Sequence, residues 1–483
     1  MAFNTLREKY RCTSMTVKAS VWYTMCNVIN KGIALLSTPI FTRILTENEY
    51  GTFSIFQSWF SILIIFSSLN VFLSGYQKGL LLFKNDIKRF TASQLGLTTT
   101  ITFFCAAIYL ANIKFWTNIF ELAPKLMFAM FFELLLMPAL ELWSAQQRFN
   151  YKYKKYVFLT LAMSTITVFG GVIAVLCSKY KLEARVYMDV ISKSIFAGIL
   201  FILIFSSGKC FFNKKYWQYS LVFNLPLIPH YLSNYILNQS DRIMIGKMVG
   251  NTQAAYYSVA YTISTMMLLI TNAINNSLTP YLYRSLENDT KKEIKSATKS
   301  VLLLVASLCL FTMIFAPEII KIFAGKQYLD AIYVIPPIAA SVFFIFLYSL
   351  FSNVEYYYQK TGFIAIATCL SAVINLILNF IFIKRFGYYA AGYTTLVCYI
   401  CLSLFHYIFY KRVLKLENLE IDIYDLKIIL LLSLLVLLGM IIMVMTYNMM
   451  IIRYGILLVI LFLSFIYRNK IRTTILEVRK EKR

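Results

Sequence analysis

Apolar stretches of membrane-crossing length recur from one end of the 483-residue chain to the other. A helix rises 1.5 Å per residue, so about 20 apolar residues cross the roughly 30 Å hydrocarbon core of a bilayer. The pattern predicts an all-α polytopic membrane protein of about fourteen transmembrane helices with short loops. The expected spans are 19–41, 51–74, 91–111, 126–142, 157–177, 186–206, 220–245, 254–279, 300–316, 331–351, 362–383, 389–410, 428–446 and 450–467.

Basic residues cluster in alternate loops of this pattern. About two thirds of the 47 lysines and arginines fall in the segments that lie on the same side as the N-terminus. Cytoplasmic loops of membrane proteins are enriched in lysine and arginine, and one missed helix would invert every later loop. We therefore expect an even number of spans with both termini in the cytoplasm.

The composition agrees with a membrane protein and excludes several other classes. Hydrophobic residues make up 59% of the chain and charged residues 14%, against roughly 25% charged in soluble domains. The net charge of +25 suits a basic cytoplasmic face against anionic membrane lipid, so no nucleic-acid partner is expected. The nine cysteines lie mostly in apolar runs, where a thiol packs as a small hydrophobe, and no metal or cofactor is expected.

The sequence also contains a weak internal repeat. Residues 42–57 align with residues 246–261 at an offset of 204, and residues 181–187 fall near 387–393 at an offset of 206. The offset equals six spans, an even number, so the two halves share one orientation, and such transporters place the substrate between the halves. We expect two pseudo-symmetric six-helix lobes at 1–210 and 211–412, followed by two extra helices and a basic tail at 413–483.

The first helix of each predicted lobe is too polar to face lipid on all sides. A charge at the centre of a membrane helix costs roughly 2.5–3.5 kcal/mol, whereas a single polar residue between helices contributes only about 0.6 kcal/mol. One asparagine alone would suggest helix–helix contact, but aligned stripes in two repeat-related helices favour a hydrated cavity. The stripes are Ser20, Thr24, Asn27, Lys31 and Thr38 in the first helix, and His230, Asn234, Asn238 and Asp241 in the seventh, with Gln239 and Arg242 adjoining.

Other intramembrane charges and prolines carry separate expectations. Asp189 and Lys193 are four residues apart, so we expect them to neutralise each other on one helix face. Glu133 has no basic partner within a turn of its own helix and could carry a proton, as could His230, although a structural role is the commoner one for a cavity histidine. Prolines should interrupt the seventh helix at Pro226 and Pro229, and the tenth at Pro336-Pro337.

Two segments resemble a known family. TPIFTRILTENEYGTFS, and LPLIPHYLSNYILNQSDRIMIG followed by AAYYSVAYTIS, are similar to the openings of the two halves of Wzx-like O-antigen and capsule flippases. These belong to the multidrug/oligosaccharidyl-lipid/polysaccharide (MOP) superfamily. The resemblance runs through all fourteen predicted spans. It places Arg43, Asp241 and Arg242 on the family's charged positions, while Ala255 replaces the usual glycine.

The resemblance implies a substrate and a location. The substrate would be undecaprenyl-pyrophosphate carrying an oligosaccharide repeat unit, moved across a bacterial inner or plasma membrane by alternating access, coupled to protons or sodium. A polysaccharide polymerase and chain-length machinery would be partners. Candidate contacts for the pyrophosphate are Lys31, Arg242 and Arg43; for the glycan Asn27, Asn30, Tyr231, Asn234, Asn238, Gln239 and Asn272; for coupling Asp241, His230 and Glu133.

Two other functions remain open. A MATE-like exporter of small molecules shares the superfamily, but a cavity for cationic drugs would be dominated by acids rather than by cations and amides. A membrane glycosyltransferase or polymerase of the same pathway would commonly need a large outer loop with catalytic acids. The first outer loop offers only Glu47 and Glu49, which helix capping explains, so no enzyme is expected.

Overall fold

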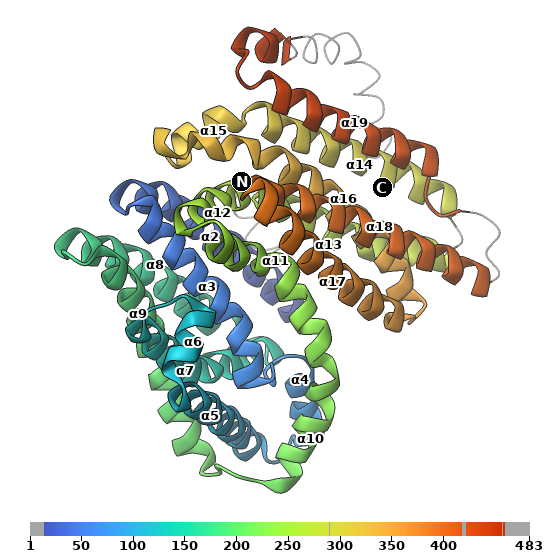
Figure 1. Ribbon diagram of the computed structural model, residues 1–483. Coiled ribbons are helices and arrows are strands. Elements are labelled where there is room, and N and C mark those ends of the chain that lie inside the picture. The colour runs from blue at the N-terminus through green and yellow to red at the C-terminus, as the bar shows by residue number, and fades with distance from the viewer. Residues whose placement is uncertain (1–13, 289, 418–421, 456, 459–483) are drawn as a thin grey trace, which may run out of the picture. The chain divides into compact units, whose positions relative to one another are not determined.

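The computed structural model describes residues 14–288, 290–417, 422–455 and 457–458, and in these ranges the chain is helical throughout, with no strand. Contacts divide the chain into two compact units, Met1–Ala255 and Tyr256–Arg483. We refer to them as unit 1 and unit 2 (Figure 1).

In its described residues, unit 1 contains seven long helices and several short ones. Its elements are α2 (Met15–Ile44), α3 (Glu47–Ser68), α4 (Ser74–Leu82), α5 (Ile87–Ala111), α6 (Ile113–Phe120), α7 (Pro124–Phe149), α8 (Tyr153–Cys177), α9 (Lys181–Gly208), α10 (Lys214–Asn224), the 3₁₀ turn η1 (Leu225–Leu227) and α11 (Ile228–Met248). The helix α12 (Asn251–Thr265) crosses from unit 1 into unit 2.

Unit 2 repeats the succession of long helices. After α12 it contains α13 (Met267–Glu287), α14 (Lys291–Ile314), α15 (Ala316–Phe323), the 3₁₀ segment η2 (Lys326–Tyr333), α16 (Ile335–Tyr357), α17 (Thr361–Phe386), α18 (Tyr389–Leu416) and α19 (Leu426–Thr446).

Eleven helical segments in the described residues are long and apolar enough to cross a membrane. The predicted spans without a counterpart among them are the two polar helices and the last one. The helices α2 and α11 have 30 and 21 residues, so they are long enough but too polar. The span 450–467 lies mostly outside the described residues. The chain is a multi-pass all-α membrane protein, and the number fourteen stays a prediction.

Proline has different effects at the two predicted interruptions. The turn η1, which contains Pro226, separates α10 from α11, as expected, and Pro229 lies in the first turn of α11. The prediction for the tenth helix was wrong, because Pro336 and Pro337 lie in the first turn of α16, after η2. Proline is tolerated there, since first-turn N–H groups have no partner within the helix.

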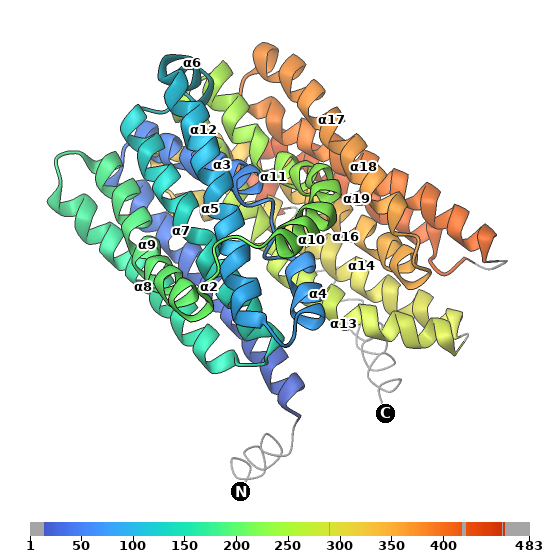
Figure 2. The same cartoon turned by 90° about the horizontal axis from the view of Figure 1, so that it is seen from below.

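The same order of packing appears in both units. In unit 1, α7 lies against α5 and α9, and α9 also packs on α8. In unit 2, α16 lies against α14 and α18, and α18 also packs on α17. Both views show α8 beside α9 and α17 beside α18 (Figures 1 and 2). Each unit therefore has a central helix, α7 or α16, in the corresponding place of the sequence repeat.

Two contacts position the polar helices of unit 1. The helix α2 runs along α8, with Phe41 and Leu45 packed against Val175, and α11 lies along α3. By these contacts α11 belongs to unit 1, although the sequence repeat puts it in the lobe 211–412. Contact density and sequence repeats measure different properties, so the lobe limits remain a prediction.

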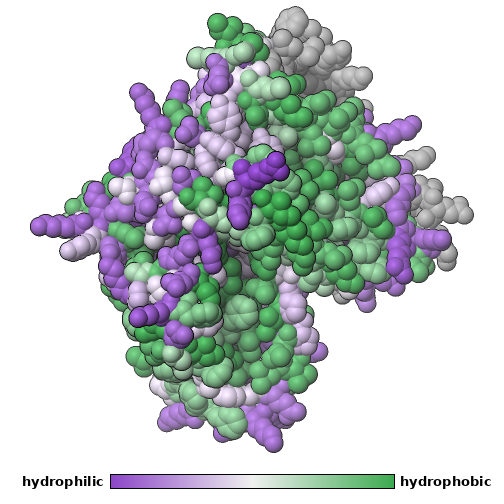
Figure 3. Space-filling model, in the orientation of Figure 1, coloured by the Kyte–Doolittle hydropathy of each residue, from purple (hydrophilic) through white to green (hydrophobic). Residues whose placement is uncertain are grey.

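The surface is that of a protein surrounded by lipid. Hydrophobic residues cover wide areas of the face drawn in Figure 3, and hydrophilic residues gather in its upper-left part and at its lower and right edges. Many of the exposed side chains are large and apolar, such as Phe158 at 76% and Ile202 at 68% exposed. In water such areas would be a liability, whereas in a bilayer they are the expected contact surface.

Candidate functional site

The polar stripe predicted on the seventh helix is present on α11. Its amide side chains bond to the backbone one turn earlier: Asn234 Nδ2 donates to the His230 carbonyl oxygen at 3.2 Å, and Asn238 Nδ2 to the Asn234 oxygen at 2.7 Å. His230, Tyr231, Asn234 and Asn238 are each half-buried. His230, Asn234 and Asn238 therefore form one ladder along a single, partly accessible face of α11.

The charged end of this stripe is buried. Arg242 is 9% exposed, and its guanidinium donates to the Asn238 carbonyl oxygen at 2.9 Å and to Gln239 Oε1 at 2.8 Å. Gln239 Oε1 also accepts a hydrogen bond from Ser58 of α3 at 3.2 Å. The neighbouring Asp241 is fully buried. Arg242 is thus held in place by the Asn238 carbonyl oxygen and the Gln239 side-chain amide.

The stripe on α2 is much more exposed. Asn27 and Lys31 are exposed, Asn30 is half-buried, and only Thr38 is buried. Arg43 lies twelve residues beyond Lys31, about 18 Å along the helix and about 120° around it, where its guanidinium donates to the Pro39 carbonyl oxygen at 2.6 Å. Lys31 and Arg43 therefore occupy different heights and different faces of α2.

The segment after α2 shows why its residues form a recognisable motif. Thr46 caps α3, and Glu49 returns the contact by accepting the Thr46 N–H at 2.8 Å, so these residues form a capping box, as expected for this acid. Gly51 lies against the Asn251 carbonyl oxygen, which a Cβ at this position would meet at 1.8 Å. Asn251 Nδ2 donates to Thr52 Oγ1 at 2.9 Å. The glycine thus permits α3 to touch the start of α12.

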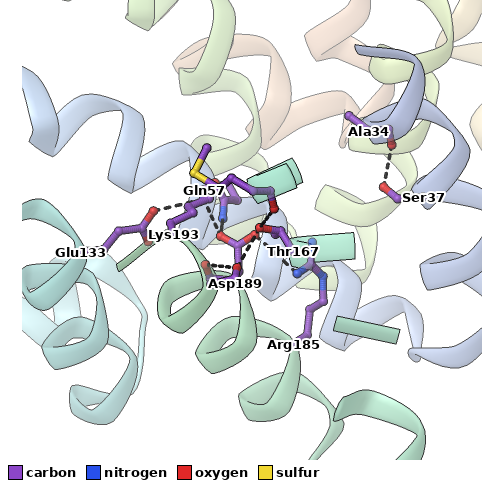
Figure 4. A network of polar contacts seen from close by, with 10 residues as sticks. Ala34, Ser37, Gln57, Glu133, Thr167, Arg185, Asp189 and Lys193 are labelled. Atoms are coloured by element: carbon purple, nitrogen blue, oxygen red, sulfur yellow. Dashed lines mark hydrogen bonds and ion pairs between the residues drawn. The ribbon is translucent and has the colours of Figure 1, made fainter. Parts of the chain in front are cut away.

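A buried cluster of charged side chains joins α3, α7 and α9 (Figure 4). Asp189 accepts hydrogen bonds from Lys193 Nζ at 2.6 Å and from Gln57 Nε2 at 2.9 Å. Lys193 Nζ also reaches Glu133 Oε1 at 3.1 Å. The predicted Asp189–Lys193 pair is confirmed, and Glu133, which has no basic partner on its own helix, finds one on α9.

Arg185 completes the cluster and is absent from the sequence-based candidates. Its Nη1 lies 3.4 Å from Asp189 Oδ1, and its guanidinium carbon lies 4.2 Å from the ring centroids of both Phe41 and Phe53. Two cations therefore face two carboxylates, so the cluster is formally neutral. The sequence spacing could have indicated this residue, because Arg185, Asp189 and Lys193 follow one another at intervals of four residues and so lie on one helix face.

Unit 2 has polar groups of a different kind. Glu355 of α16 and His406 of α18 are almost fully buried, with Glu355 Oε1 2.9 Å from His406 Nδ1. Asn353 Nδ2 donates to Asn275 Oδ1 at 2.9 Å. Asn272, the glycan candidate of this unit, is exposed on α13. The sequence reasoning missed the Glu355–His406 contact, because the predicted tenth span ended before Glu355.

One protein-family model matches more than half of the chain and so shows the family to which the chain belongs. The model described as "Polysaccharide biosynthesis protein" matches residues 16–286, which include α2 and α11. The chain belongs to the polysaccharide biosynthesis protein family. A second model, MatE, matches residues 226–381. This member of the family therefore carries sequence features of two branches of the MOP superfamily.

Relatives of this polysaccharide biosynthesis protein occur in bacteria and archaea. "Lsg locus putative protein 1" of Haemophilus influenzae is 26% identical over 376 residues, which cover 74% of this chain and 88% of that protein. "Probable low-salt glycan biosynthesis flippase Agl15" of Haloferax volcanii is 24% identical over 260 residues, covering 50% and 52% of the two chains.

Solved structures show the same fold. The lipid II flippase MurJ in an inward closed conformation has a TM-score of 0.71 at 17% identity, covering 93% of this chain and all of that one. An inward-facing MATE-family transporter has a TM-score of 0.67 at 12% identity, covering 81% and 96%. The family match and this fold identify a Wzx-like MOP transport protein rather than an enzyme.

Proposed function

We propose that this protein is a flippase for undecaprenyl-pyrophosphate-linked oligosaccharide repeat units, carrying them from the cytoplasmic to the outer leaflet for surface polysaccharide assembly. The polar faces of α2 and α11 would line the path by which the headgroup crosses, and the polyprenyl tail would stay in lipid. Alternating access of the two predicted lobes would open this path to each side in turn.

The charge of α2 is the observation that carries this proposal. This exposed polar helix contains Lys18, Lys31 and Arg43 and no acidic residue. A diphosphate is an anion, and lysine and arginine are the usual side chains for binding phosphate groups. Exposed Asn27 and the half-buried amides of α11 offer the hydrogen-bonding groups that a glycan needs.

The buried cluster suggests where a coupling proton could bind. Glu133 Oε2 is buried and has no hydrogen-bond partner among the described residues, while Glu133 Oε1 contacts Lys193. A proton on this carboxyl group would weaken the contact between α7 and α9 and change the formal charge of the cluster from zero to +1, with Lys193 still paired to Asp189. Glu133 is thus a better-placed candidate for coupling than His230, which bonds within its own helix.

A MATE-like exporter is the second candidate, favoured by the MatE match to residues 226–381. The two functions differ in the charge of the substrate. An exporter of cationic dyes would draw little benefit from Lys31, whereas a carrier of pyrophosphate should depend on it.

The decisive measurement is flipping in liposomes that contain the purified protein. The probe is undecaprenyl pyrophosphate carrying a short oligosaccharide with a fluorophore on the sugar, and an impermeant quencher reports the label in the outer leaflet. We expect the protein to make the inner-leaflet probe accessible. Lys31→Ala and Arg242→Ala should each slow this by about tenfold or more, because each removes a charge-assisted contact to phosphate.

Lys247→Ala is the matched control, because Lys247 is an exposed cation near the end of α11, away from the stripe. It should flip the probe at the wild-type rate. Lys31 is exposed, so its replacement should leave folding intact even if Arg242→Ala does not. Normal flipping by Lys31→Ala and Arg242→Ala would reject the assignment of these cations. Extrusion of cationic dyes without flipping would favour the exporter.

A further inference from the structure

A lipid-facing groove runs along α8 in unit 1 and is not used by the proposed transport path. Its volume is about 770 Å³, and one face of α8 together with Trp22 of α2 lines it. The lining is apolar apart from Thr165 and, at one end, the polar groups of Tyr153 and Lys154; its apolar residues include Phe158, Ala162 and Ile166. Phe158 is 76% exposed, so the groove is open to its surroundings.

The end of the groove at the start of α8 is built from aromatic rings. Trp22 and Tyr153 stack with centroids 6.2 Å apart and planes 10° from parallel. Beside them, Tyr23 meets Tyr156 edge-on at 5.3 Å, and the Tyr23 hydroxyl donates to the Gln147 carbonyl oxygen at 3.2 Å. Tryptophan and tyrosine prefer the headgroup level of a bilayer, so this end marks the membrane interface.

The charge at this end has one sign. Arg148 lies in the last turn of α7, and Lys152, Lys154 and Lys155 lie at the start of α8, where Lys154 lines the groove itself. Neither α2 nor α8 contains an acidic residue. No side chain caps the first turn of α8, so its N–H groups add to the attraction for an anion.

The length of the groove matches one acyl chain. From Tyr153 to Ile166, α8 rises about 20 Å, which reaches from the headgroup level past the middle of a hydrocarbon core roughly 30 Å thick. An anionic group at Lys154 and an apolar chain along Phe158 and Ile166 would therefore fit a single molecule. A ligand without a tail would leave the apolar part unused, and a neutral lipid would leave the cations unused.

We propose that this groove is a binding site for an anionic diacyl phospholipid, with the phosphate at Lys154 and one acyl chain along α8 toward Ile166. The site lies within unit 1 and is independent of the flippase assignment. A bound lipid would brace α2 against α8 at the interface, where Trp22 and Tyr153 stack.

Photo-crosslinking tests the proposal in the full-length protein. Phe158 is replaced by benzoylphenylalanine, the protein is placed in liposomes of equal phosphatidylglycerol and phosphatidylethanolamine, and the crosslinked lipids are identified by mass spectrometry. We expect the ratio of phosphatidylglycerol to phosphatidylethanolamine adducts at Phe158 to be about fivefold above the bulk ratio, the factor that one lysine near the membrane surface provides. Benzoylphenylalanine at Phe104 of α5, which is 66% exposed, is the control and should report the bulk ratio.

Two variants locate the selectivity. Lys154→Glu should return the adducts at Phe158 to the bulk ratio, whereas Lys84→Glu, an exposed lysine in the loop after α4, should not. Ala162→Phe should reduce all adducts at Phe158 by filling the groove. Bulk ratios at Phe158 in the wild-type protein, or enrichment that survives Lys154→Glu, would overturn the proposal. Preferential crosslinking of added undecaprenyl phosphate would overturn it in favour of a polyprenyl tail.

Discussion

In both units a buried polar contact joins the central helix to the corresponding neighbour, α7 to α9 in unit 1 and α16 to α18 in unit 2. The two contacts differ in their chemistry and in their position along the helix. In unit 1, Glu133 of α7 meets Lys193 of α9, nine residues after α7 begins at Pro124. In unit 2, Glu355 of α16 meets His406 of α18, two residues before α16 ends at Tyr357. The repeat therefore preserves the packing of helices, while each unit has acquired its own buried polar chemistry.

The positions matched by the offset of 206 make this difference plain. Glu133, Asp189 and Lys193 correspond to Ala339, Thr395 and Tyr399, which are buried and uncharged. In the other direction, His406 corresponds to Leu200, which is also buried. The charged residues of the cluster therefore have uncharged counterparts at these positions of unit 2, so the charged cluster is a property of unit 1.

Removing Lys193 should have the largest effect. Lys193→Ala leaves Asp189 with one cation, Arg185, and removes the cation that contacts Glu133, and breaking a buried ion pair costs about 3–5 kcal/mol. Chemical denaturation of the purified protein in detergent measures the loss. The matched control is Tyr399→Phe in unit 2, which should cost no more than about 1.5 kcal/mol as the loss of one hydroxyl. Equal losses would mean that the cluster contributes no more than ordinary packing.

Sequence periodicity was sufficient for the fold and for the polar stripes. The stripes on α2 and α11 need only the 3.6-residue period within one helix, and both are present. The capping box at Thr46 and Glu49 is equally local, and it explains the acids that could have suggested an enzyme. Features that depend on one helix could therefore be predicted from the sequence.

Contacts between helices could not be predicted from the sequence, and errors in the predicted ends of the spans concealed further contacts. The partnership of Glu133 with Lys193 depends on how α7 and α9 are set against each other, which spacing within a helix does not encode. Arg185 lay one residue before the predicted span 186–206 and so looked like a loop residue, whereas α9 begins at Lys181. Glu355 lay beyond the predicted span 331–351, whereas α16 continues to Tyr357.

A smaller effect is expected at the corresponding contact of unit 2. Glu355→Gln keeps the size of the side chain but removes its charge, so the hydrogen bond with His406 loses its charged acceptor. Weakening one buried, charge-assisted hydrogen bond should cost about 1–3 kcal/mol in the same denaturation measurement. The matched control is Leu200→Met in unit 1, at the position that corresponds to His406, where a volume-conserving change should cost less than about 1.5 kcal/mol. A loss for Glu355→Gln as large as that for Lys193→Ala would remove the contrast between the two units.

The smallest effect concerns the shape of a cation rather than its charge. Arg185→Lys keeps a positive charge for Asp189, but an ammonium group lacks the flat guanidinium that lies between Phe41 and Phe53. We expect a loss of about 0.5–2 kcal/mol, the range of cation–π contacts from exposed to desolvated sites. Arg148→Lys is the matched control, because among the described residues Arg148 faces one ring, that of Tyr156, at 5.5 Å, and should lose less. If the two variants lose the same stability, the two phenylalanines contribute only packing, and the cluster in unit 1 depends on charge balance alone.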